Sequence, residues 1–418
     1  MKFIRTVSTR RLLAVIAGIV AAIAAGTAIA VAAAGNGPVP PPKPLASSLH
    51  NALTAPSVDG VSADITFTNN LIGSTDFTGD ASDPILQGAG GRLWVSADGR
   101  LRLELQSSDG DAQVVVDNNS FWVSDPSANT VYEGTLPAHK ASSAAAGASG
   151  SAGHAIPSVD AIQSDLNKLM AHVNLIGADH SNPTDVAGQA AYSVSISPRH
   201  DGGLLGSAEL AWDAATGVPL NVAIYAKGNS TPVLELKADD ITYGPVSPSA
   251  FDVTPPAGAK VVQISSADEN PTAPLAAAKH AGHARHADVT GVVAVASHLS
   301  FSFDPPGSLV GLPRHAVSLL SWGGEPAALV TYGRGLGGIV VIERGAQGQR
   351  SPTGSASSQT GTGSGLSLPT VSINGATGQE LDTALGTVVS FSSGGVSYTV
   401  LGSVPPVAAE HAARALTP

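Results

Sequence analysis

Three histidines at a spacing of three are the tightest group of residues in this chain that could do chemistry. His280, His283 and His286 could share one face of a helix, where imidazole rings bind divalent metal ions. The segment around them has the composition of a linker, and Asp288 is the nearest carboxylate. Because a metal site needs ligands held by surrounding structure, we expect these histidines to be solvated and to bind no metal.

The sequence contains no catalytic motif in a sequence context that would support its function. No G-x-S-x-G, H-E-x-x-H, Walker or G-x-G-x-x-G motif lies between the strand and helix patterns that such a motif needs. The run from Tyr332 to Gly338 (YGRGLGG) resembles a phosphate loop but lacks the Lys-Ser/Thr ending and a following helix, so it predicts a turn between strands. A hydrolase with a hidden site stays an alternative, but we expect a protein without enzymatic activity or cofactor.

The composition excludes several classes of protein. Cysteine is absent from the 418 residues, so disulfides, thiolate metal sites and cysteine nucleophiles are impossible. A chain of this length can instead be held together by burial of a core. The net charge of −11 argues against a broad nucleic-acid surface.

The N-terminal residues predict export across a membrane. An uncharged apolar stretch, Leu12 to Ala34, follows four basic residues: Lys2, Arg5, Arg10 and Arg11. Its length suits a spanning helix, so we expect an uncleaved anchor with the rest of the chain on the outer face of the cytoplasmic membrane. The small-x-small triplets at 28–30 and 32–34 leave cleavage and secretion open.

Composition shifts divide the remaining chain. We expect a Pro-rich spacer at 35–44, a first domain at 45–262, a flexible linker at 263–288 and a smaller domain at 289–418. Low-complexity segments interrupt the two domains at 141–155 and 345–365.

Both domains are expected to combine strands and helices. The first domain has alternating runs such as Val61–Phe67, and Asp98-Gly99 predicts a two-residue hairpin between 92–97 and 100–106. Apolar stripes predict one helix through Leu45, Leu49 and Leu53, and a second from Val159 to Val173, both covering the apolar face of the sheet. In the smaller domain, β-rich runs precede a helix at 407–416 whose packed stripe would be Ala408, Ala412 and Leu416.

Five apolar residues are candidates for lining a ligand pocket in the first domain. A sheet with covering helices forms either a filled core or a hollow one, and the pattern alone leaves both open. The candidates come from three expected strands and one helix: Trp94, Leu103, Trp122, Leu166 and Met170.

Several segments of the first domain resemble the LolA-like lipoprotein-carrier superfamily. The resemblance rests on Arg92-Leu93-Trp94-Val95, on 100–104 (RLRLE), on 117–126 (DNNSFWVSDP) and on Asn129–Tyr132. The residues at 241–243 and 251–256 resemble the end of the same domain. This resemblance implies a strongly curved antiparallel sheet, a half-barrel with helices on its concave side, and space for an acyl chain.

The smaller domain resembles that of RseB/MucB regulators. The strand pair Ala328–Leu336 and Ile339–Glu343, and the ending Thr399–Pro405 followed by an Ala-rich helix, carry the resemblance, with Arg334 where the family has Asp. RseB-type proteins combine a LolA-like domain with a small domain of α+β class. They hold an anti-sigma factor and respond to lipids or lipoproteins.

These resemblances imply two functions. The first is an extracytoplasmic carrier that binds a lipid or lipoprotein in an apolar pocket. The alternative is an RseB-type regulator that binds a membrane anti-sigma factor and senses envelope lipids. For either function we expect an acyl chain or lipoprotein as ligand, and we expect the protein to bind no metal and no nucleic acid.

Overall fold

The computed structural model describes eleven segments of the chain: residues 39–72, 84–108, 110–117, 119–126, 129–136, 157–177, 182–200, 202–264, 289–322, 325–346 and 368–417. The expected membrane anchor, the three histidines of the linker and both low-complexity tracts lie outside these residues. No helix in the described segments is long and apolar enough to cross a membrane.

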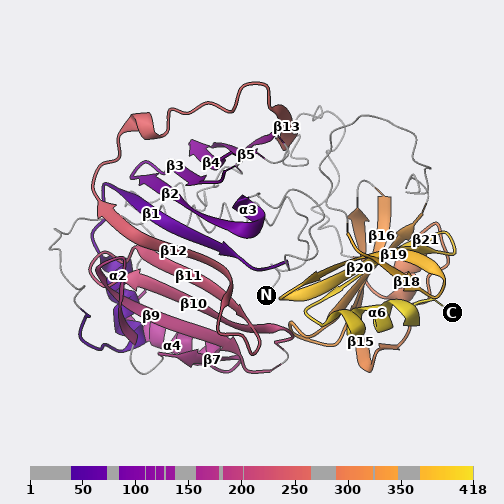
Figure 1. Cartoon of the computed structure of the whole chain (residues 1–418). Coiled ribbons are helices and arrows are strands. Elements are labelled where there is room, and N and C mark those ends of the chain that lie inside the picture. Colours follow the sequence, from indigo (N-terminus) through magenta and orange to yellow (C-terminus); the bar gives the residue numbers. More distant parts are fainter. Residues whose placement is uncertain are drawn as a thin grey trace, which may run out of the picture.

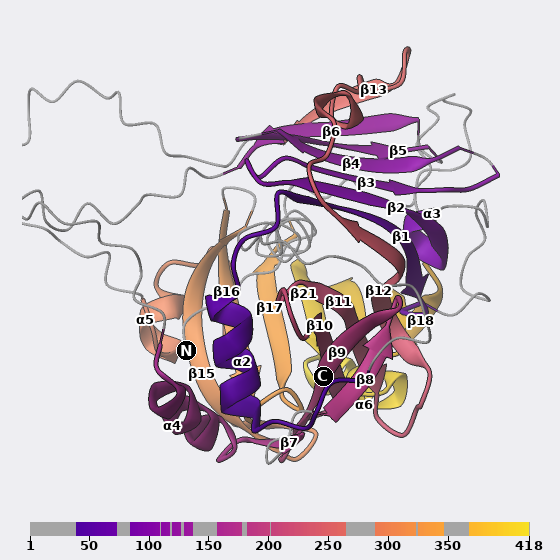
Figure 2. The same cartoon turned by 90° about the vertical axis from the view of Figure 1, so that its left-hand side faces the viewer.

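Most of the chain N-terminal to the linker forms one 13-stranded sheet that curls strongly along its length (Figures 1 and 2). Its strand order is β13-β6-β5-β4-β3-β2-β1-β12-β11-β10-β9-β7, and β8 also pairs with β9. All pairs are antiparallel except β13 with β6. The strands are β1 Gly60–Asn69, β2 Gly88–Ser96, β3 Leu101–Leu105, β4 Ala112–Asp117, β5 Ser120–Asp125, β6 Thr130–Thr135, β7 Val173–Ile176, β8 Asn182–Val186, β9 Gln189–Pro198, β10 Leu205–Asp213, β11 Pro219–Ala226, β12 Pro232–Tyr243 and β13 Lys260–Ile264.

Alternation along the strands gives this sheet one apolar face, which is the concave one. In β1, Val61, Ala63 and Ile65 are buried. Ala63 lies opposite Leu93 of β2 and Ile241 of β12, so the apolar face continues across the three strands. The predicted alternation is therefore confirmed, and it produces a large core on this side.

Two helices pack on the apolar face, but only at its β9–β10 end. They are α2 (Leu45–Thr54) and α4 (Val159–Leu169), and the predicted cap of α4 is present because the Ala161 N–H donates to Ser158 Oγ at 3.2 Å. Their side chains share a small core with β9 and β10, which includes Leu45, Leu166, Tyr192 and Trp212. The short helix α3 (Pro84–Gln87) adds Ile85 near β1. The expected helical covering is thus correct only in part, and the fold is more strongly β than predicted.

The outer face of β2 and β3 carries the segment that leads from β12 to β13. This segment contains a 3-10 turn, η1 (Pro248–Ala250). Arg102 donates from Nη1 to the Ala250 carbonyl at 3.2 Å, and the Arg100 guanidinium lies 4.8 Å from the centre of the buried Phe251 ring. Two arginines therefore hold this segment on the sheet: Arg102 of β3, and Arg100 of the turn just before β3.

The chain beyond the linker forms a second, 8-stranded sheet in the order β14-β15-β16-β17-β21-β20-β19-β18. Two helices flank it, α5 (Val292–Ala296) and α6 (Pro406–Ala415). The strands are β14 Ser308–Leu309, β15 Leu312–Trp322, β16 Glu325–Tyr332, β17 Ile339–Gly345, β18 Thr370–Ile373, β19 Ala376–Thr383, β20 Gly386–Ser393 and β21 Val396–Gly402. The predicted turn at YGRGLGG is confirmed between β16 and β17.

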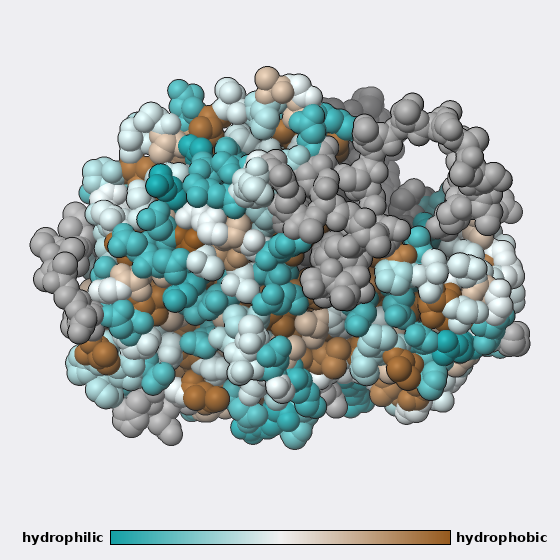
Figure 3. All heavy atoms as spheres, viewed as in Figure 1, coloured by the Kyte–Doolittle hydropathy of each residue, from teal (hydrophilic) through white to brown (hydrophobic). Residues whose placement is uncertain are grey.

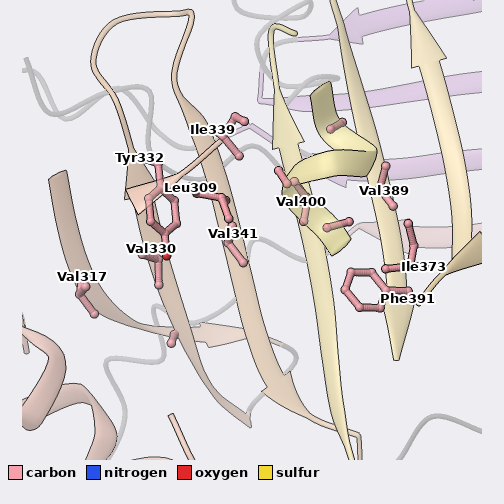
Figure 4. Close-up of a cluster of buried hydrophobic side chains, with 14 of the residues drawn as sticks. Leu309, Val317, Val330, Tyr332, Ile339, Val341, Ile373, Val389, Phe391 and Val400 are labelled. Atoms are coloured by element: carbon pink, nitrogen blue, oxygen red, sulfur yellow. The ribbon is translucent and has the colours of Figure 1, made fainter. Parts of the chain in front are cut away.

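One face of the second sheet forms a compact core, whose side chains Figure 4 shows projecting from β15, β16, β17, β20 and β21. Helix α6 begins at Pro406, one residue before the predicted start, and packs on this face. Its buried residues are Ala409, Ala412 and Ala413, and Leu416 packs beside them. The predicted stripe is therefore correct at Ala412 and Leu416 and wrong at Ala408, where the buried position is Ala409.

A buried carboxyl group interrupts the apolar core of the second sheet. Glu343 of β17 is 5% exposed and follows Val341 on the core face. No salt bridge among the described residues involves it. Burial raises the pKa of this carboxyl group to about 7, because the charged form loses its hydration.

This carboxyl group should make the stability of the second sheet depend on pH. The folded-state pKa of about 7 lies above the unfolded value of 4.5, so the folded chain holds the proton more tightly. The free energy of unfolding should fall as pH rises from 4.5 to about 7, by roughly 3 kcal/mol, and then level off. Glu343→Gln should remove this slope and raise stability at pH 8, as measured by urea unfolding. Glu325→Gln, at an exposed site of the same sheet, is the control; an unchanged slope in Glu343→Gln would contradict the assignment.

Candidate functional site

An apolar cavity lies inside the curl of the first sheet. It is a narrow, partly open hollow with a cavity volume of about 40 Å³. β2 and β1 line one side and β12 and β11 the other, and these two walls join where β1 pairs with β12, so segments far apart in sequence lie side by side in it. The lining residues are Val58, Gly60, Val61, Ala63, Ile65, Leu93, Val95, Val218, Pro219, Leu220, Asn221, Val222, Leu236, Ala238 and Ile241.

Local irregularities in the strands shape this cavity. The β1–β12 register shifts between Asp64 and Ile65, and the β10–β11 register shifts between Ala211 and Trp212. Such bulges increase the local twist and bend the strands, which closes the two walls toward each other. Small residues then keep space between the walls, since Ala63 and Ala238 stand where larger side chains would fill it.

The residues that line the cavity are almost all apolar. The lining contains no charged side chain, and Asn221 is its one polar residue. Nearby, the Tyr243 hydroxyl donates to Asp213 Oδ2 at 2.7 Å, while Asp213 Oδ1 accepts from the backbone N–H groups of Ala215 and Thr216. Burial, reinforced by the Asp213 charge, raises the pKa of Tyr243, so its hydroxyl stays a neutral donor. This pair ties the β10–β11 turn to β12 and presents no nucleophile.

The predicted pocket residues do not gather at this cavity. Leu103 packs against the large core on the concave face, but Trp94 and Trp122 point to the outer face. Trp94 lies under the Arg102 guanidinium, 5.0 Å from its ring centre. Leu166 belongs to the helical core at the β9–β10 end, and Met170 caps the end of α4.

The hairpin between β2 and β3 explains the position of Trp94. A two-residue turn at Asp98-Gly99 would place Trp94 opposite Leu103. The observed turn spans Ala97 to Gly99, since the Ser96 N–H donates to the Arg100 carbonyl and Gly99 has a φ of 87°. The register therefore moves by one residue, Leu93 faces Leu103, and Trp94 turns to the other face.

Sequence reasoning missed the wall formed by β11 and β12. The signals were present: Val218-Pro219-Leu220 follows the Ala215–Gly217 turn, and Val233 to Leu236 alternates as a strand. Nothing in these patterns showed that β12 would pair with β1.

The two sheets meet at a small junction made largely of backbone groups. The Leu204 N–H donates to the Ser403 carbonyl at 3.1 Å and to its Oγ at 2.9 Å, and the Ser403 hydroxyl donates to the Leu385 carbonyl at 2.7 Å. At a second point the Ala384 N–H donates to the Leu71 carbonyl at 2.9 Å. The loop between β9 and β10 therefore fastens the first sheet to the end of β21.

Among the described residues, no group of His, Asp and Glu could hold a metal ion. The cavity and the junction together define the site: an apolar hollow in one sheet, and a contact through which that sheet meets the second.

Comparison with known proteins gives a distant likeness in structure. MucB in complex with MucA(peri) aligns with 17% identity over 89% of this chain and 98% of that chain, at a TM-score of 0.39. The MucA/MucB complex of Pseudomonas aeruginosa gives 17% identity, coverages of 88% and 96%, and the same TM-score of 0.39. An uncharacterized conserved protein from Thermus thermophilus covers 52% of this chain and 98% of its own length, with 11% identity and a TM-score of 0.31. Because these TM-scores are below 0.5, we draw no functional argument from them.

Comparison by sequence gives no match. No protein-family profile and no curated protein matches this chain.

The junction should break when a side chain is added at Gly203. A Cβ there would collide with the Ser403 carbonyl and hydroxyl, and the glycine has a φ of 61°. Gly203→Ala should release the contact and increase the radius of gyration in small-angle scattering. Gly228→Ala is the matched control, because Gly228 has a φ of 78° but open space around its Cβ position. Both variants carry a backbone cost of about 1–2 kcal/mol, so equal scattering profiles would show that the junction does not hold the two sheets together.

Proposed function

We propose that this chain is an extracytoplasmic regulator of the RseB type. In this proposal it binds a segment of a membrane anti-sigma factor, and an acyl chain in the apolar cavity changes the affinity of that binding. The observation that carries the proposal is the aliphatic cavity in a sheet that is fastened to a second unit through defined contacts. The chain acts as a binding protein and not as an enzyme.

An acyl chain is the ligand that suits the cavity. Its lining is almost entirely aliphatic. Binding of an acyl chain is therefore stabilised by the removal of apolar surface from water, by about 0.8 kcal/mol for each buried CH₂. A polar or charged group inside would lose its hydration with little compensation, since Asn221 is the one polar residue there. The head group of a lipid or lipoprotein therefore stays outside.

The second unit supports a regulatory role. The residues that carry the RseB-like sequence resemblance form the β16–β17 pair and the β21–α6 ending. The β21 end is also the part of the second sheet that meets the first sheet, through Ser403. A ligand that shifts the β9–β10 loop would thus act on this unit directly.

The expected N-terminal anchor places this function at the membrane. With Leu12–Ala34 in the bilayer, the described residues would lie on the outer face of the cytoplasmic membrane, within reach of lipids and of membrane partners.

A lipid or lipoprotein carrier is the second candidate, favoured by the cavity alone. The two functions differ in their need for the junction. A carrier releases its ligand to an acceptor, and breaking the junction should leave ligand binding unchanged. A regulator needs the junction to link ligand and partner.

Filling the cavity should abolish ligand binding. In Ala63→Phe the added ring points into the hollow, and displacement of a fluorescent fatty acid from the full chain should show a large loss of affinity. Ser62→Phe, on the same strand but the opposite face, is the control and should bind normally. Equal binding by both variants would mean that the cavity is not the ligand site.

The regulatory step is tested separately. The extracytoplasmic segment of an anti-sigma factor encoded beside this gene should bind the full chain in calorimetry, and oleic acid should weaken that binding in the wild type but not in Ala63→Phe. Fatty-acid binding without any effect on the partner would favour the carrier.

A further inference from the structure

Two turns at one end of the second sheet expose large apolar side chains. Val310 lies in the turn between β14 and β15 and is 42% exposed, and Leu336 lies in the turn between β16 and β17 and is 44% exposed. The turns are two strand spacings apart, about 10 Å. The Gly333 N–H donates to the Pro313 carbonyl, which fixes the second turn beside the base of the first.

The Val310 turn is strained. Val310 and Gly311 have φ values of 44° and 83°, a left-handed pair that β-branched residues rarely adopt. The same sheet contains the same turn at Asn374-Gly375, with φ values of 46° and 87°, where the suitable residue is used. An exposed valine in place of asparagine therefore adds strain and contributes nothing to the core, which indicates a role outside the fold.

The charge around these turns is opposite to that of the whole chain. Residues 307–318 and 333–338 contain no Asp or Glu and include Arg314, His315 and the exposed Arg334, whereas the chain has a net charge of −11. This end of the sheet would attract an anionic surface.

The first unit continues the same pattern. Helix α4 and strand β7 end at Leu169 and Ile176, which are 40% and 67% exposed. Residues 166–177 also lack Asp and Glu, although Lys168 pairs with the preceding Asp165. Nearby Arg199 is exposed and donates to Asn174 instead of a carboxylate. In Figures 1 and 2, α4, β7 and the ends of β15–β17 that carry the turns lie along the lower edge of the molecule. Figure 3 shows small hydrophobic patches near that edge, over both units, with hydrophilic surface between them.

We propose that this lower edge docks on an anionic lipid bilayer, with Val310 and Leu336 inserted between the head groups. Separate apolar protrusions with cations beside them suit the bilayer interface, whereas a protein partner would call for a continuous groove or patch. The proposal concerns a surface distinct from the cavity and does not rest on the proposed regulatory function.

A fluorescent probe at the turn tests this docking. Because the chain has no cysteine, Leu336→Cys can be labelled at one site with a polarity-sensitive dye. The full chain is added to vesicles of phosphatidylglycerol and phosphatidylcholine, and flotation selects the vesicle-bound protein. The dye emission should shift to the blue, less so in high salt. A dye at Val293→Cys, 85% exposed on α5 of the same unit, should show no shift.

A second substitution separates docking from folding. Val310→Asn, made in the labelled chain, should melt at the same or a higher temperature because it relieves the turn, yet reduce the shift several-fold. Vesicle-bound protein with no shift at position 336, an equal shift at position 293, or a full shift in Val310→Asn would overturn the proposal. A shift that depends on protein concentration without vesicles would also overturn it, in favour of a second copy of the chain.

Discussion

The pairing of β1 with β12 is the contact on which the rest of the first unit depends. It joins the run β2–β6 to the run β9–β11 in one sheet, and side chains as distant as Thr66 and Asp239, 173 positions apart, hydrogen bond across it. Both walls of the cavity lie next to this seam. The bulge at Asp64/Ile65 lies within the seam, so the bend of the sheet and the shape of the hollow have the same origin.

The β9–β10 hairpin connects the separate parts of the molecule. At one end, Tyr192 and Trp212 pack with α2 and α4, with ring centres 6.2 Å apart. At its other end, Gly203 and Leu204 contact Ser403 of the second unit. Since β10 also pairs with β11, which lines the cavity, one hairpin contacts the helices, the cavity wall and the junction. A shift of this hairpin at any one of these contacts would therefore move the residues at the other two.

Local elements could be predicted from the sequence because their signals are local. Alternation identified β1 and β9, the Ser158 cap marked the start of α4, and Pro406 marked the start of α6. The site was predicted less well, since it depends on register and bulges. One extra residue in the Ala97–Gly99 turn was enough to move Trp94 to the outer face. Alternation shows which residues share a face, but long-range pairing decides which walls meet.

The distance between β1 and β12 along the chain also has a consequence for biogenesis. As the chain is made or threaded out from its N-terminus, β1 to β6 can pair in sequence as a meander, but β1 then keeps an unpaired edge. About 160 residues separate the end of β1 from the start of β12, and about 100 of them still follow after β6 is complete. During this interval the half-built sheet exposes both a free strand edge and its apolar face, which favours aggregation unless a chaperone covers them.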